Sequence, residues 1–132
     1  MWSDFLDGAM SAYEMIIEAF AKGDLETLKH LLSKDVYTDF ASAIKERDEK
    51  GHVLQTTLVR LCDTSCESVT QQGSLTSIVL RFVTEQTHVL RDKKGTILEG
   101  DPKRVEEIID TWTFSRNLKS KNPNWTLVEV DN

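Results

Sequence analysis

The sequence predicts an α+β fold in which N-terminal helices pack on a curved antiparallel sheet and form a cone. Apolar residues recur at three- and four-residue steps before Gly51, which is typical of amphipathic helices. After His52, β-branched residues and two-residue alternation become common. Turn-type residues separate these strand patterns at intervals too short for parallel crossovers, so antiparallel pairing is expected.

The first helix is predicted to begin at a cap formed by Ser3 or Asp4, whose side-chain oxygens accept amide protons of the first turn. It runs to about Ala21, and Gly23 suits a left-handed end. Its apolar stripe consists of Phe5, Ala9, Ala12, Tyr13, Ile16, Ile17 and Phe20. Such a stripe normally faces a core.

Two further helices are predicted before the strands. Asp24 caps a short one, and its inward residues are Leu25, Leu28, Leu31 and Leu32. Ser33 or Asp35 caps the next, which Gly51 closes. The apolar stripe of that third helix is Val36, Tyr37, Phe40, Ala41 and Ile44.

The second half of the chain supplies the sheet. Residues 71–73 and 92–95 have turn compositions. The expected strands are 53–63, 75–91, a short one within 96–102, 105–116 and 125–130. A length of 132 residues without a linker predicts one domain over residues 1–132.

Composition excludes several functions. The net charge of −6 and a pI near 5.0 argue against a nucleic-acid partner and against general attraction to anionic lipid. Two cysteines, Cys62 and Cys66, are too few for a disulfide framework, and the three histidines show no ligand spacing. We therefore expect no metal and no cofactor. No apolar stretch is long enough for a membrane helix, and no signal-peptide pattern is present.

The strand 110–116 alternates aromatic and polar residues, with Trp112 and Phe114 on one face. One interpretation is that this face is ordinary core, packed to the usual density of protein interiors. The other is that it lines an apolar cavity between sheet and helices, as ligand pockets are lined. The candidate lining is Tyr13, Ile17, Phe20, Tyr37, Phe40, Phe82, Trp112 and Phe114.

Two acidic residues, Glu106 and Asp110, share that strand face with Trp112. A carboxylate among apolar neighbours can act as a base in enzymes. However, the sequence shows no His–Asp or Ser–His pairing, so no catalytic residue is expected. The favoured role of Asp110 is a salt bridge to one of three arginines, Arg60, Arg81 or Arg116.

Two groups of residues are candidates for membrane or partner contact. The first turn carries Trp2, Phe5 and Leu6, and aromatic residues at the start of an amphipathic helix suit interfacial insertion. The polar face of this helix is acidic, so such contact would be hydrophobic, or these residues belong to the core. A basic spot at the last hairpin, with Lys93 and Lys94 as its expected neighbours, is either a docking point or a solvated turn. It consists of Arg116, Lys119 and Lys121.

Several segments together carry a family resemblance. They are GAMSAYEMIIEAFAKGDLETLKHLLSKDVYTDFASAIKERDEKG, FVTEQT and GTILEGDPKRVEEIIDTWTFSRNLKSKNPNW, in family order over nearly the whole chain. The chain resembles the Tim-forty-four-like domain family. This family includes the C-terminal domain of the mitochondrial inner-membrane import-motor tether and bacterial, mainly alphaproteobacterial, relatives. The resemblance implies a fold similar to nuclear transport factor two, of the cystatin-like kind.

The resemblance also implies a function. It predicts a non-enzymatic adaptor or tether, peripheral on the inner membrane with the cytoplasmic face favoured. Its expected partners are membrane lipid such as cardiolipin and protein-translocation components. A bacterial origin is favoured, and the family offers no catalytic residues to carry over. The alternatives are a small-molecule or lipid carrier using the cone cavity and, less favoured, an enzyme of the same fold.

Overall fold

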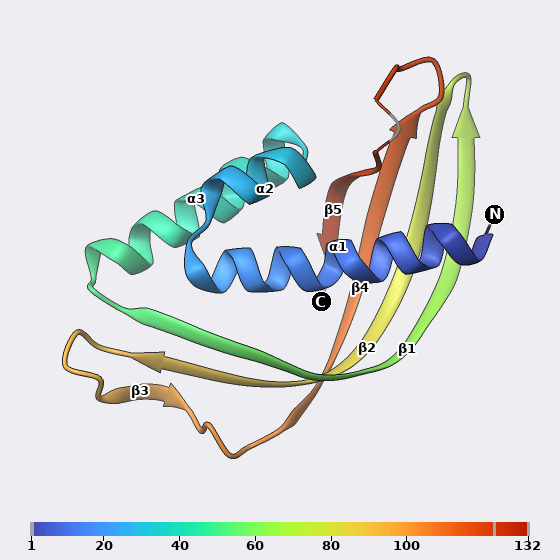
Figure 1. Cartoon of the computed structure of the whole chain (residues 1–132). Coiled ribbons are helices and arrows are strands. Elements are labelled where there is room, and N and C mark those ends of the chain that lie inside the picture. The colour runs from blue at the N-terminus through green and yellow to red at the C-terminus, as the bar shows by residue number, and fades with distance from the viewer. Residues whose placement is uncertain (1, 123, 132) are drawn as a thin grey trace.

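The computed structural model describes residues 2–122 and 124–131, without the side chains of Trp2 and Ser3. Three helices precede five strands along the chain (Figure 1). The helices are α1 (Trp2–Lys22), α2 (Leu25–Leu31) and α3 (Lys34–Glu49). The strands are β1 (Val53–Gln72), β2 (Leu75–Arg91), β3 (Ile97–Gly100), β4 (Glu106–Asn117) and β5 (Thr126–Asp131).

The helix boundaries follow local chemistry. The carboxylate of Asp24 accepts the N–H of Thr27 at 3.1 Å and caps α2. The hydroxyl of Ser33 accepts the N–H of Val36 at 3.4 Å and caps α3. Gly23 ends α1 with a φ of 73°, a left-handed value that glycine adopts without a Cβ clash. These caps confirm the predicted starts of α2 and α3. Of the two residues predicted as the cap of α3, Ser33 is the cap and Asp35 is not.

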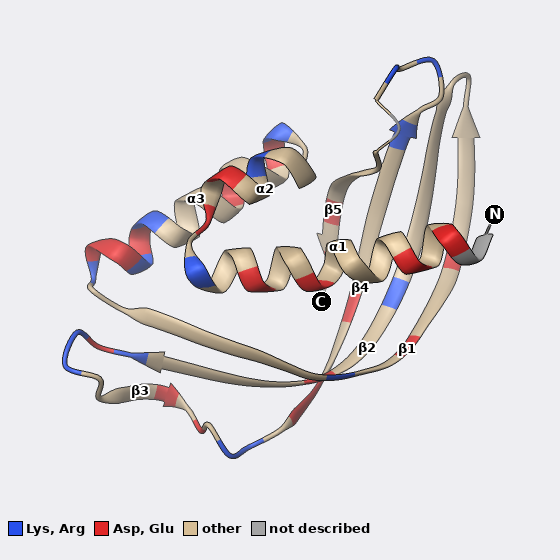
Figure 2. Cartoon of the chain, viewed as in Figure 1, with Lys and Arg blue, Asp and Glu red and all other residues tan. Residues whose placement is uncertain are grey.

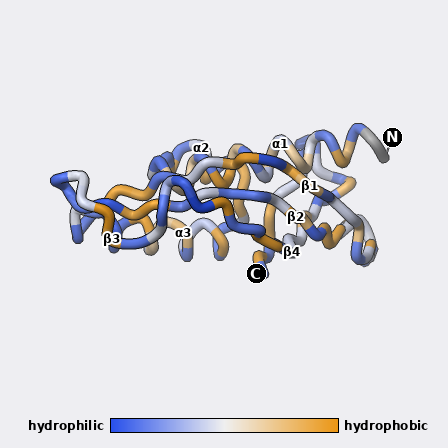
Figure 3. The backbone as a smooth tube through the Cα atoms, turned by 90° about the horizontal axis from the view of Figure 1, so that it is seen from below, coloured by the Kyte–Doolittle hydropathy of each residue, from blue (hydrophilic) through white to orange (hydrophobic). Residues whose placement is uncertain are grey.

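The sheet is antiparallel throughout, in the order β1-β2-β4-β5, and β3 pairs with the far end of β2. It bends strongly, and the helices lie on one side of it (Figure 1). Hydrophobic and hydrophilic residues follow one another along the strands, as a half-buried sheet requires (Figure 3). The predicted α+β class and layer arrangement are confirmed.

The longest strand, β1, exceeds its prediction. It continues past Asp63 to Gln72, where the sequence is rich in Ser, Thr and Gln and both faces are largely exposed. Its pairing with β2 shifts at Leu58/Arg60, Leu61/Asp63 and Cys66/Ser68. Each shift is a β-bulge, which adds twist and bends the strand. These bulges account for the curvature of the long β1–β2 pair.

The core lies between α1 and the inner face of β2 and β4. Its largest fully buried apolar side chains belong to α1, α2 and strands β2 and β5: Tyr13, Ile16, Leu28, Leu80, Phe82 and Leu127. One inward prediction is wrong, because Leu25 is 38% exposed at the first position of α2. Leu28 and Leu32 fill the space predicted for that helix.

Charged residues are unevenly placed (Figure 2). The loop after β4 carries Lys119 and Lys121, whereas the turn between β2 and β3 carries Lys93 and Lys94. These two segments lie at opposite ends of the molecule (Figures 1 and 2). The expectation that the two lysine pairs are neighbours is therefore wrong, because β2 and β4 reach these segments at opposite ends of their antiparallel pair.

Candidate functional site

The aromatic face of β4 is packed. Tyr13 stacks on Phe82 with 4.5 Å between ring centroids and also lies 4.5 Å from Trp112. Phe82 and Trp112 are 5.7 Å apart, and Trp112 lies 6.4 Å from Phe114. All four side chains are buried. The rings contact one another, so the filled-core interpretation describes these residues and no cavity separates them.

The other four candidate lining residues surround this cluster. Phe20 and Phe40 meet edge to face at 5.2 Å, and both are half-buried, as are Ile17 and Tyr37. Ile17 borders a separate hollow of about 460 Å³ between α1 and the start of β1. Of the eight predicted lining residues, only Phe114 lines the open groove between α1, β2 and β4 in the described structure.

A polar network lies inside the aromatic core. The hydroxyl of Tyr13 donates to Asp110 Oδ2 at 2.5 Å and accepts from Gln86 Nε2 at 2.9 Å. Gln86 Nε2 also donates to Thr84 Oγ1 at 2.8 Å. All four residues are almost fully buried. The network joins α1 to β2 and β4 and therefore fixes how the helix sits on the sheet.

The pKa of Tyr13 is raised above its usual value, chiefly because burial disfavours the phenolate and secondly because the hydroxyl donates a hydrogen bond to Asp110. The prediction that Asp110 pairs with an arginine is wrong for the described residues. Asp110 lies on the inner face opposite Phe82, while Arg81 points to the outer face and Arg60 pairs with Glu85 at 2.8 Å.

Arg116 shares the inner face with Asp110 but lies six residues further along β4, about 20 Å away at strand spacing. The other acidic candidate, Glu106, is exposed and lies 3.7 Å from Arg104. Glu106 and Asp110 therefore do not form a pair of carboxylates at an accessible apolar site.

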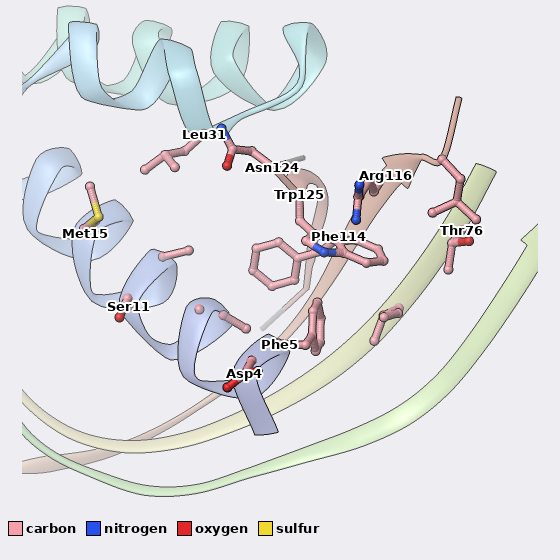
Figure 4. A pocket seen from close by; sticks show the side chains of 15 residues that line it. Asp4, Phe5, Ser11, Met15, Leu31, Thr76, Phe114, Arg116, Asn124 and Trp125 are labelled. Atoms are coloured by element: carbon pink, nitrogen blue, oxygen red, sulfur yellow. The ribbon is translucent and has the colours of Figure 1, made fainter. Parts of the chain in front are cut away.

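An open groove of about 800 Å³ lies at one end of the molecule (Figure 4). It runs between α1, the ends of β2 and β4, and the loop before β5 (Figures 1 and 4). A volume of this size is within the usual range of ligand pockets. Its large apolar lining residues are Phe5, Met15, Leu31, Ile78, Phe114, Leu118 and Trp125.

The middle part of the α1 wall of the groove is made of small residues. Gly8, Ala9, Ser11 and Ala12 all line it. A Cβ built on Gly8 would have no heavy atom within 4 Å, so the backbone there faces open space. Phe5 of α1 also reaches across to Trp125, which precedes β5, and their rings meet edge to face at 5.0 Å.

A cation lies at the β4 end of the groove. Arg116 lines it, and the buried Nε of this guanidinium has no hydrogen-bond partner among the described residues. Arg116 also takes part in none of the ion pairs found among them. The chain therefore supplies no carboxylate that neutralises this guanidinium in the described structure, and its positive charge remains at the groove.

The predicted contact residues are only partly brought together. Phe5 and Arg116 line the groove, and Lys119 and Lys121 are exposed in the loop beyond it. Leu6 borders a different hollow beside Leu61. The side chain of Trp2 lies outside the described residues.

Sequence reasoning missed much of the groove: Gly8, Met15, Leu118 and Asn124. The signal that points to the first of these is a glycine inside a strong helical pattern, which costs helix stability and so calls for a packing reason.

Other site types have no support in the part of the chain that is described. No group of three or more His, Cys, Asp or Glu side chains there is arranged to hold a metal ion. None of the helices described is both long and apolar enough to cross a bilayer.

The fold and groove define a class: a small α+β domain whose helices cover one side of a curved antiparallel sheet and leave an open apolar groove at one end. The sequence model of the Tim44-like domain matches residues 2–132. The chain therefore belongs to the Tim44-like domain family, which confirms the resemblance seen in the sequence.

Two animal proteins are among the relatives of this chain. The mitochondrial import inner membrane translocase subunit TIM44 of Mus musculus is 24% identical over 119 residues, which cover 87% of this chain. The probable mitochondrial import inner membrane translocase subunit tin-44 of Caenorhabditis elegans is 30% identical over 122 residues, again 87% of the chain. The aligned part covers only 26% and 28% of these two relatives, so the chain spans about a quarter of their length.

Solved structures show the same fold at low identity. The intermembrane space region of the chloroplast protein ARC6 has a TM-score of 0.62 at 17% identity, covering 93% of this chain and 92% of that one. A conserved protein from Planctomyces limnophilus has a TM-score of 0.50 at 16% identity, covering 99% and 98%. The likeness to nuclear transport factor two stays a prediction.

Proposed function

We propose that this chain is a single, non-enzymatic adaptor domain that associates peripherally with an inner membrane and with protein-translocation components. Membership of a family that includes translocase subunits supports the role. The observation that supports membrane contact is a short basic segment in an otherwise acidic chain. Residues 115–127 contain Arg116, Lys119 and Lys121 and no acidic residue, while the whole chain has a net charge of −6.

The surroundings of this basic loop strengthen the proposal. Residues 69–80, which include the turn from β1 to β2, carry no charged side chain. Leu75 and Leu118 are 44% and 49% exposed at this end of the molecule. Cations beside exposed apolar side chains fit an anionic bilayer surface, because lysines attract the head groups while apolar groups enter the interface. Cardiolipin supplies such head groups in the proposed setting.

Flotation with liposomes tests the membrane contact. Phosphatidylcholine vesicles with and without cardiolipin are compared, and we expect recovery of the protein in the lipid fraction only with cardiolipin. The double variant Lys119→Ser/Lys121→Ser should lower partitioning about thirtyfold, because each lysine near an anionic surface contributes about 1 kcal/mol. Lys93→Ser/Lys94→Ser is the matched control, since it removes the same charge at the opposite end. The proposed membrane contact would be rejected if no protein were recovered in the lipid fraction, or if both double variants lost partitioning equally.

A second function has one observation in its favour. The groove of about 800 Å³ is large enough for a small apolar ligand, so a carrier role is the alternative. Organic extraction of the purified protein followed by mass spectrometry tests it. A stoichiometric apolar compound would favour the carrier, and a protein that yields none would favour the adaptor.

A further inference from the structure

We propose that the groove between α1 and β4 binds an acidic amphipathic helix of a protein partner. This inference rests on the proposed adaptor function and names the chemistry of the protein that the adaptor holds. Three features of the groove carry it: a wall with open space beside Gly8, an apolar floor, and a cation that takes part in none of the ion pairs found among the described residues.

The α1 wall suits a helix. Gly8 and Ala12 are four residues apart, so they lie one above the other on the same face of α1, and both line the groove. A small residue at each of two such positions lets a second helix approach closely, backbone to backbone. The space beside Gly8 is open to at least 4 Å, so no side chain of the described structure fills this approach.

The floor suits the apolar face of such a helix. Phe5, Phe114 and Trp125 present aromatic surface, and Met15 and Leu31 continue it toward α2. An amphipathic helix anchors in a groove of this kind through apolar residues at one-turn spacing. Met15 is 48% exposed, which leaves an adaptable apolar side chain at the edge of the groove.

The charge of the groove selects the polar flank of the partner. Arg116, near the end of β4, lines the groove and takes part in none of the ion pairs found among the described residues. Carboxylates of Asp or Glu are the acceptors that a guanidinium binds most strongly in proteins. Asp4 is the one acidic side chain among the lining residues and lies on the α1 wall, so the acidic flank of the partner faces β4.

An acyl chain fits these features less well. Lipid tails need apolar surface, but this groove is also lined by Ser11, Thr76 and Asn124, which offer hydrogen bonds to a polar chain. Larger apolar side chains would also offer a lipid tail more contact area than the small residues of the α1 wall do. We therefore assign the groove to a helix and leave the lipid contact to the exposed lysines of the loop.

A selection experiment identifies the probe. A displayed library of helix-length peptides, randomised among Ala, Leu, Phe, Glu and Lys, is panned against the protein. The most enriched peptide is then synthesised with its glutamates intact, with glutamine in their place, and with lysine in their place. Fluorescence anisotropy measures the Kd of each peptide. We expect enrichment of amphipathic peptides rich in Glu, and a tenfold to hundredfold weaker Kd after replacement by glutamine, as for the loss of a hydrogen bond to a charged group.

Two variants of the protein locate the binding site. Gly8→Leu fills the groove from a position with free space, so it should preserve the melting temperature and abolish binding. Asp7→Leu, one residue earlier and outside the groove, is the control and should bind as the unaltered protein does. Arg116→Gln should weaken binding of the glutamate peptide by about the same factor as replacing its glutamates by glutamine does. The glutamine peptide should bind Arg116→Gln no more weakly than it binds the unaltered protein, because the two changes remove the same interaction.

Three results would overturn the proposal: no enriched peptide, enrichment of lysine-rich peptides, or binding that Gly8→Leu leaves intact. Cardiolipin vesicles form a separate arm. Loss of vesicle binding in Gly8→Leu without any peptide binding would assign the groove to lipid and reject the helix, while the adaptor function would stand. If the unaltered protein binds the peptide but does not float with the vesicles, only the membrane contact would be rejected.

Discussion

The buried hydrogen bonds of Tyr13 offer a sharp test of the packing scheme. Tyr13→Phe removes one oxygen and keeps the ring that stacks on Phe82 and lies beside Trp112. The change leaves Asp110 without the hydroxyl that donates to it at 2.5 Å and leaves Gln86 without one acceptor. Any loss of stability therefore reports the polar network and not the aromatic packing.

The magnitude follows from burial. Asp110 and Gln86 are 3% and 1% exposed, so water does not replace the lost partner. Leaving a buried polar group unsatisfied costs about 1–3 kcal/mol. Gln86 keeps its bond to Thr84, which limits its share. We expect the free energy of unfolding to fall by about 2–4 kcal/mol, a large part of the roughly 5–15 kcal/mol that is typical of small domains.

Urea unfolding followed by circular dichroism measures this change. The matched control is Tyr37→Phe, because the Tyr37 hydroxyl takes part in none of the hydrogen bonds found among the described residues. The control should alter stability by less than about 0.5 kcal/mol. Combining Tyr13→Phe with Asp110→Leu should cost less than the sum of the single changes, because both partners become apolar. A Tyr13→Phe protein as stable as the unaltered one would refute the reasoning.

Three further predictions concern pH, backbone geometry and the hydrogen bonds at the end of α1. Since the pKa of Tyr13 is raised in the folded state, its contribution is complete below pH about 10 and is lost as pH rises above that value. Denaturant titrations at alkaline pH should show this fall, and Tyr13→Phe should flatten it. Gly100→Ala should destabilise by more than about 2 kcal/mol in thermal unfolding, because φ is 83° and the new Cβ would lie 2.0 Å from a main-chain carbonyl oxygen. Gly95→Ala, with φ 88° and open space around it, should cost only about 1 kcal/mol, and equal losses would contradict the steric argument. Arg47→Met should cost about 1–2 kcal/mol, since the guanidinium donates to two carbonyl oxygens at the end of α1 at 2.9 and 3.1 Å; a calorimetric melt unchanged from the unaltered protein would count against this.

The elements with strong local signals were predictable from the sequence. Asp24 and Ser33 cap their helices as expected, and Gly23 ends α1, because these features depend only on nearby residues. The second half of β1 was not predictable in the same way. Its polar residues form a strand because β2 pairs with them along its whole length, which is a tertiary effect that propensity does not contain.

The candidate site was harder to predict. The aromatic alternation correctly placed Trp112 and Phe114 on one face but did not show whether that face was filled. The answer depends on where α1 crosses the sheet. Tyr13 falls over Phe82 and fills the centre, while Gly8 and Ala12 fall over the ends of β2 and β4 and leave the groove open. Residue spacing along one helix does not specify that crossing point.

The bulges of β1 also protect the molecule from its own neighbours. This strand lies at one edge of the sheet, so its outer backbone groups have no strand beside them in the described structure. A long straight edge would be a template for another chain, and amyloid-like growth begins at such templates. Here the shifts at three places limit the longest regular stretch to residues 53–58. The same irregularities that curve the sheet therefore keep a long unpaired edge from recruiting further copies at high concentration.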